Sequence, residues 1–135
     1  ARYWFQKSAE QGHTYAQYAL GKLLLSDDPE VHDVEDGIRW LKRAAESGNH
    51  FAAYRLGKEY YRGKTIGRSL TTAAKWFERG AQAGNQYAQY MLGKLYLTGQ
   101  GVTHDQAQAM DWFSRSAALS KKYVRLSFFR RLMSA

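Results

Sequence analysis

Residues 73–102 read AAKWFERGAQAGNQYAQYMLGKLYLTGQGV, and this stretch decides the fold because it recurs along the chain. Its tryptophan is one of the four that the protein contains, and all four stand 36 residues apart: Trp4, Trp40, Trp76 and Trp112. A constant period in this range is typical of a repeat array, in which one helical motif stacks on the next. We therefore expect an extended surface that holds a partner.

Other residue types keep the same period. An aromatic or leucine position, an alanine position and two glycine positions recur in three or four units: Phe5, Leu41, Phe77 and Phe113; Ala9, Ala45, Ala81 and Ala117; Gly12, Gly48 and Gly84; Gly21, Gly57 and Gly93. The spacing does not drift, so each unit has the same length and is expected to have the same internal geometry.

Each unit is predicted to contain two helices, which in the clearest unit cover residues 71–83 and 86–97. Ser69 stands where a helix N-cap is needed, and Gly84 can adopt the left-handed conformation that closes the first helix. Gly93 lies in the middle of the second helix, where glycine costs about 1 kcal/mol relative to alanine. Its recurrence indicates that a neighbouring helix approaches the backbone there. The N-cap equivalents in the other units are Asp33 and Asp105.

With these residues, the pattern A-x-x-W-F…G-N-x-x-A-x-Y-x-L-G-x-x-Y-x-x-G-x-G-V over residues 73–102 resembles the Sel1-like repeat, a relative of the tetratricopeptide repeat. The resemblance implies an all-α fold, a right-handed α/α solenoid of about eight helices, used in bacteria for protein–protein interaction and scaffolding. It also implies that the first helix of each unit lines the concave side. More loosely, residues 84–96 are similar to Sel1 arrays at the C-termini of plasmid-mobilisation, relaxase-type proteins.

We predict a single array over residues 1–135, with units at about 1–32, 33–68, 69–104 and 105–135. The last unit is expected to end in a capping helix over residues 121–133, because Phe129 replaces the packing glycine. The chain begins at Ala1 without the segment that precedes the other tryptophans, so we expect a fragment of a longer protein. The absence of cysteine fits a reducing, cytoplasmic location.

Aromatic side chains at helical spacing beside small residues are typical of a core, so all four tryptophans are expected to be buried. The chain has no thiol nucleophile, no nucleophile-elbow serine and no P-loop, which argues against an enzyme. The acidic stretch 27–36 lacks the ligand spacing of a calcium loop, and the four histidines have no zinc spacing. We expect no metal and no cofactor, and no apolar run is long enough for a membrane span.

The net charge of +8, with a pI near 9.8, favours an anionic partner. Cations recur at period 36 in two rows, and a concave groove for an acidic protein or peptide is predicted from the first helices: Tyr3, Lys7, Arg39, Arg43, Lys75, Arg79, Asp111 and Arg115; the second row is Lys22, Lys58, Lys94 and Arg130. Three alternatives remain open: solvated repeat charges without a function, a nucleic-acid-associated accessory domain, and self-association as a homodimer through exposed repeat ends.

Overall fold

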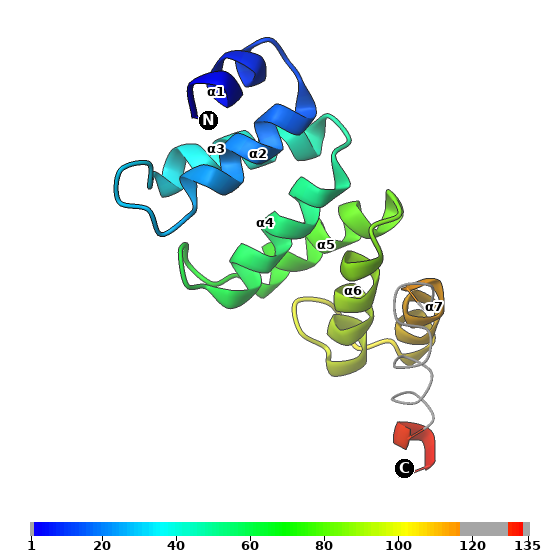
Figure 1. Ribbon diagram of the computed structural model, residues 1–135. Coiled ribbons are helices and arrows are strands. Elements are labelled where there is room, and N and C mark those ends of the chain that lie inside the picture. Colours follow the sequence, from blue (N-terminus) through cyan, green and yellow to red (C-terminus); the bar gives the residue numbers. More distant parts are fainter. Residues whose placement is uncertain (1, 117–129, 134–135) are drawn as a thin grey trace.

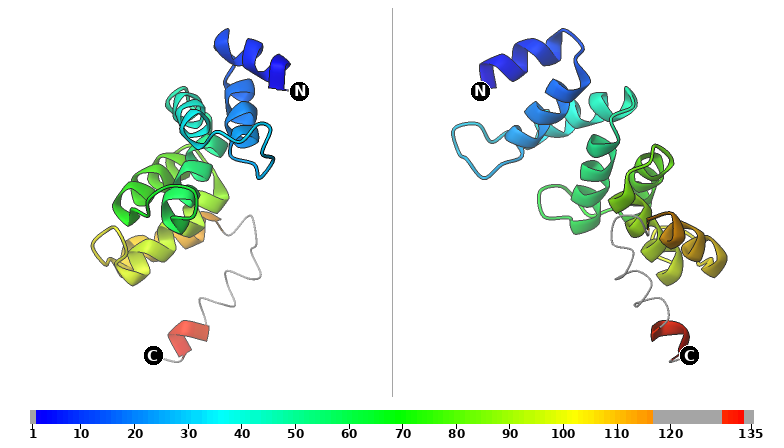
Figure 2. Two further views of the ribbon diagram at one scale, coloured as in Figure 1. Left: turned by 90° about the vertical axis from the view of Figure 1, so that its left-hand side faces the viewer. Right: turned by 45° about the vertical axis from the view of Figure 1, so that its right-hand side comes forward.

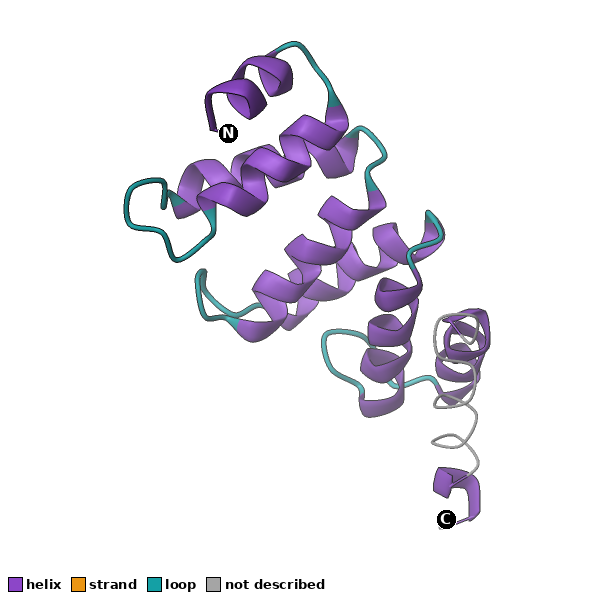
Figure 3. Cartoon of the chain, in the orientation of Figure 1, coloured by secondary structure: helices purple, strands orange, loops and turns teal. Residues whose placement is uncertain are grey.

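The computed structural model describes residues 2–116 and 130–133, and these residues form helices joined by loops (Figures 1 and 3). The helices are α1 (Arg2–Glu10), α2 (Thr14–Leu24), α3 (Val34–Glu46), α4 (His50–Arg62), α5 (Leu70–Gln82), α6 (Gln86–Thr98) and α7 (Gln106–Ser116), and residues 130–133 are also helical. This confirms the all-α fold of about eight helices, and α5 and α6 match their predicted ranges within one residue at each end. Most of the predicted capping helix lies outside the described residues.

The helices stack in chain order. Each described helix packs chiefly against the helices before and after it, and among more distant pairs only α4 and α6 contact each other appreciably. The array therefore extends from the N-terminal helix to the C-terminal helix, as the rotated views show (Figure 2). This is the nearest-neighbour architecture of an α/α solenoid, whose stability is distributed over its unit interfaces.

Capping side chains fix the helix starts that the sequence predicts. Asp33 accepts a hydrogen bond from the Asp36 amide, and Ser69 accepts one from the Thr72 amide. The Asp105 carboxylate accepts from the Gln108 amide in the same way. Each cap satisfies a backbone donor that the helix itself cannot pair.

The mid-helix glycines let consecutive units approach closely. A methyl group added at Gly57 would lie 2.5 Å from Cδ1 of Phe77, and one added at Gly93 would lie 2.8 Å from Cδ1 of Phe113. Gly21 has the same relation to Leu41, at 2.7 Å from Cγ. The predicted packing role is confirmed: each even-numbered helix receives the large side chain of the next odd-numbered helix.

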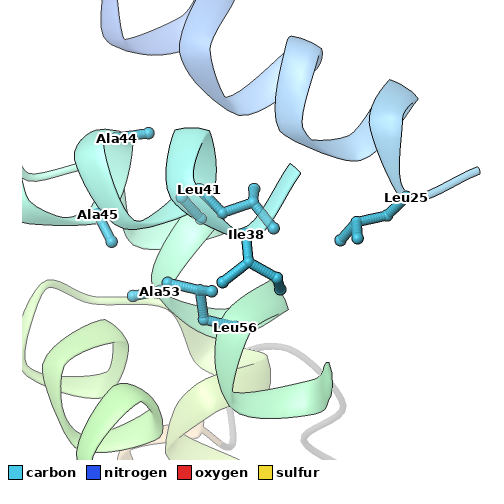
Figure 4. Close-up of a cluster of buried hydrophobic side chains, with 8 residues drawn as sticks. Leu25, Ile38, Leu41, Ala44, Ala45, Ala53 and Leu56 are labelled. Carbon is cyan, nitrogen blue, oxygen red and sulfur yellow. The ribbon is translucent and has the colours of Figure 1, made fainter. Parts of the chain in front are cut away.

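The core is divided among the unit interfaces. One cluster joins Leu25 with Ile38 and Leu41 of α3, with Leu56 of α4 and with alanines of both helices (Figure 4). A second cluster centres on Phe77 and Leu92, and a third on Leu20 and Leu24. Stacking of the units thus buries a continuous series of small cores.

The burial prediction for the tryptophans is wrong for Trp4. Trp40 and Trp112 are buried, with 6% and 8% of their surface exposed, and Trp76 is partly buried against the cluster of α3 and α4. Trp4 is 71% exposed. Each of the other three packs on helices of the preceding unit, and no described helix precedes α1. The period therefore fixes the position of the indole, and a preceding unit is needed to cover it.

Candidate partner-binding surfaces

The eight residues predicted for the groove all lie on the odd-numbered helices and are all exposed. Together they are called the odd-helix face: Tyr3 and Lys7 on α1, Arg39 and Arg43 on α3, Lys75 and Arg79 on α5, and Asp111 and Arg115 on α7. Their exposure leaves all of them available to a partner.

Three of the eight line two neighbouring hollows. Arg39 and Arg43 border a hollow of about 450 Å³, which α3 forms with Ile66 of the loop before α5. Arg79 borders a second hollow of about 270 Å³, between the start of α4 and the end of α5. Glu46 lines both, so the two hollows are adjacent. The other five predicted residues line neither hollow.

Four of the six cations of the odd-helix face lie over aromatic rings of their own helices. The Arg43 guanidinium is 4.9 Å from the centre of the Trp40 ring, and the Arg115 guanidinium is 4.6 Å from that of Trp112. The same contact recurs with Arg79 over Trp76 at 5.8 Å and with Lys7 over Tyr3 at 5.9 Å. Stacking restricts the guanidinium groups of Arg43 and Arg79 while their N–H edges remain available for a carboxylate.

Carboxylates interrupt the positive charge on this side of the array. Arg39 forms an ion pair with Asp36, and Arg115 forms one with Asp111 at 3.2 Å. Glu35 and Glu46 also border the larger hollow. The odd-helix face is therefore mixed in charge, and Arg43 and Arg79 are cations on it that form no ion pair within the described residues.

The even-numbered helices carry aromatic side chains that the sequence reasoning missed. Tyr15, Phe51 and Tyr87 are 70%, 49% and 53% exposed, although tyrosine and phenylalanine at helical spacing favour burial. All three occupy the second position of their helices, 36 residues apart, and this period was the available signal. An inner row lies one helical turn further along: Tyr18, Tyr54 and Tyr90.

Burial and neighbouring charge shift the pKa of two groups on α4. Burial, followed by the positive charges of Arg62 and Arg55, lowers the pKa of Lys58 below its ordinary value. Burial raises the pKa of Tyr54, against the opposing effect of Arg62. The positive charges on α4 thus act on one another through a partly dehydrated surface.

Comparison with known proteins gives the family. The Sel1 repeat model matches residues 1–13, 14–49, 50–85 and 86–121, which is most of the chain. The chain belongs to the Sel1 repeat family. Among solved structures, this Sel1 array is similar to a Sel1 repeat protein from Oxalobacter formigenes, with 34% identity, a TM-score of 0.82 and coverage of 97% of this chain and 96% of that one.

Two further structures extend the comparison. The array is 31% identical, with a TM-score of 0.82, to c5321, a protective antigen of uropathogenic Escherichia coli strains displaying an SLR fold; the match covers 88% of this chain and 26% of that one. Cysteine rich protein B of Helicobacter pylori shares the fold, with 20% identity, a TM-score of 0.68 and coverage of 90% and 86%. A comparison with curated proteins found no match.

Two kinds of feature are absent from residues 2–116 and 130–133. No three His, Asp or Glu side chains gather there into a group that could hold a metal ion. None of the described helices combines the length and the apolar character needed to cross a bilayer.

Proposed function

We propose that this Sel1 array is a non-catalytic module that binds an acidic protein segment along the odd-helix face. Sel1 repeat proteins are generally scaffolds that bind other proteins. The observation that carries the proposal is the position of Arg43 and Arg79, which border adjacent hollows from neighbouring units and form no ion pair within the described residues. A segment lying along both hollows would place carboxylates against both guanidinium groups.

The lining of the larger hollow adds an apolar requirement. Val34, Ile38 and Ile66 border it beside Arg39 and Arg43. A binding segment would therefore combine an aliphatic side chain, which fills the hollow, with acidic residues on either side of it. Such a combination gives affinity through apolar burial, while charge complementarity favours encounter and register.

The test begins with a peptide-display selection on the 135-residue chain. Selected peptides should be enriched in a Leu or Ile flanked by Asp or Glu, and their affinity should fall at least tenfold in the variant Arg43→Glu/Arg79→Glu. The matched control is Lys22→Glu/Lys94→Glu, which removes the same number of cations from the even-numbered helices and should leave affinity within about threefold. Selected peptides without acidic residues, or equal affinity of the charge-reversed chain across salt concentrations, would refute the proposal.

A further inference from the structure

The two sets of helices differ sharply in their carboxylates. The odd-numbered helices contain six: Glu10, Glu35, Asp36, Glu46, Glu78 and Asp111. The even-numbered helices contain one, Glu59, which is buried, lies 3.5 Å from the Arg55 side chain and accepts a hydrogen bond from Thr65. Five cations accompany it on α2, α4 and α6: Lys22, Arg55, Lys58, Arg62 and Lys94. The exposed surface of α2, α4 and α6 therefore has cations and no carboxylate.

The aromatic rings of these helices touch from one unit to the next. Tyr15 and Tyr18 of α2 are 6.3 Å apart between ring centres, and Tyr18 is 6.0 Å from Phe51 of α4. The next junction repeats the contact, with Tyr54 of α4 at 5.6 Å from Tyr87 of α6. Each exposed ring of α2, α4 and α6 thus contacts an inner ring, which belongs to the same helix for Tyr15 and to the preceding even-numbered helix for Phe51 and Tyr87.

One lysine per unit lies beside each inner ring. The ammonium groups of Lys22, Lys58 and Lys94 are 4.9, 5.6 and 5.8 Å from the ring centres of Tyr18, Tyr54 and Tyr90. We name this repeated set the even-helix face: Tyr15, Tyr18, Lys22, Phe51, Tyr54, Lys58, Tyr87, Tyr90 and Lys94. Each of α2, α4 and α6 therefore presents an exposed ring, an inner ring and a cation in the same order.

We propose that the even-helix face is a second binding surface, which takes single-stranded nucleic acid. Bases would stack on Tyr15, Phe51 and Tyr87, and phosphates would lie against the lysines. A nucleic-acid strand carries a flat base and an anionic phosphate in every residue, so it matches a surface that repeats a ring and a cation once per unit. A peptide would need aromatic and acidic side chains at one matching period, and lysine is depleted in protein–protein interfaces. The strand is therefore the better fit.

The direct test is fluorescence anisotropy with a labelled oligothymidylate of about 15 nucleotides, at salt concentrations from about 0.05 to 0.3 M. Stacking contributes roughly 5- to 150-fold in affinity per base, so Tyr15→Ala/Phe51→Ala/Tyr87→Ala should weaken binding at least tenfold. The variant Lys22→Gln/Lys58→Gln/Lys94→Gln should reduce the slope of log affinity against log salt by about 2. The control Arg43→Gln/Arg79→Gln, on the odd-helix face, should bind within about threefold of the unaltered chain, since its cations lie on the opposite set of helices.

The position of the strand can be read without any substitution. An oligonucleotide containing 5-iodouracil should cross-link on irradiation to Tyr15, Phe51 or Tyr87, as identified by peptide mass spectrometry. Four results would overturn the proposal: no binding at about 0.1 M salt, cross-links confined to the odd-numbered helices, equal loss in the odd-helix control, or a folded ring variant that binds as tightly as the unaltered chain. Acidic peptides that require the even-helix rings would overturn it as well. Failure of the acidic-peptide proposal leaves this test unaffected, because the two use different residues.

Discussion

Gly57 lies in the middle of α4, and its replacement by alanine tests the close approach between units. A new Cβ would lie 2.5 and 2.6 Å from Cδ1 and Cε1 of Phe77, which is fully buried and one of the largest side chains in the core. Alanine in place of a helical glycine gains about 1 kcal/mol of propensity. Overpacking a close-packed core costs about 1–3 kcal/mol, and a clash with two atoms of a buried ring belongs at the upper end. We expect Gly57→Ala to lower the free energy of unfolding by about 2 kcal/mol.

Two other helical glycines provide matched comparisons. At Gly93 the closest approach to Phe113 is 2.8 Å, and Phe113 is only partly buried, so the same replacement should cost less. At Gly80 the nearest atom is Ala88 Cβ at 3.2 Å, so propensity and crowding should nearly cancel. Urea unfolding followed by far-ultraviolet circular dichroism gives the midpoint for each variant. A Gly57→Ala chain as stable as the unaltered chain, or a different rank order, would show that Gly57 is not required for unit packing.

Three further predictions concern single side chains. Trp4→Ala should change the stability of the isolated chain by less than about 1 kcal/mol, whereas Trp40→Ala should cost about 3–5 kcal/mol because the latter indole is buried; urea midpoints decide between them. The side-chain oxygen of Asn85 accepts a hydrogen bond from the Ala88 amide, and its side-chain nitrogen lies 3.1 Å from Nδ1 of His50. A double-mutant cycle with alanine at Asn85 and His50 should give a coupling energy of about 0.5–1.5 kcal/mol, and a coupling of zero would refute the hydrogen bond. Burial raises the pKa of Tyr54 in the folded chain. The stability that depends on its neutral phenol is therefore present below the pKa of the unfolded chain, near 10, and is lost as the pH rises through the higher pKa of the folded chain. Tyr54→Phe should lose less stability than the unaltered chain above about pH 10, and parallel profiles of stability against pH would contradict this.

The 36-residue period was enough to predict most of the fold, because each recurring residue has a local physical role. Gly93 in a helix is unfavourable unless a neighbour requires it, and the structure supplies that neighbour in Phe113. Ser69 and Gly84 marked the start and end of a helix through their local chemistry. The hydrogen bond from the Thr72 amide to the Ser69 side chain and the φ of +97° at Gly84 confirm both roles. Local roles of this kind can be read without knowing the tertiary arrangement.

Exposure could not be predicted in the same way, because it depends on what covers a residue. Trp4 and Trp40 share a repeat position, yet only Trp40 has a described unit on which to pack. The exposure of Tyr15 was missed because the period fixes its place on the helix, beside buried Ala16, but not which face of that helix another helix covers. The ion pair between Asp36 and Arg39 could have been predicted from its spacing, and it would have shown that the odd-helix face is not uniformly basic.

The two proposed surfaces depend on the same unit contacts but on different side chains. The contact between Gly57 and Phe77 sets how closely α5 approaches α4. It therefore contributes to the spacing of Arg43 and Arg79 on the odd-helix face and of Phe51 and Tyr87 on the even-helix face. Gly57→Ala should consequently weaken the binding of both an acidic peptide and a nucleic-acid strand. The arginine variant should weaken only the binding of the peptide, and the ring variant only the binding of the strand. If the arginine variant and the ring variant each reduced the affinity for both ligands equally, the chain would have a single binding surface. The division of carboxylates between the two sets of helices would then have no role in recognition.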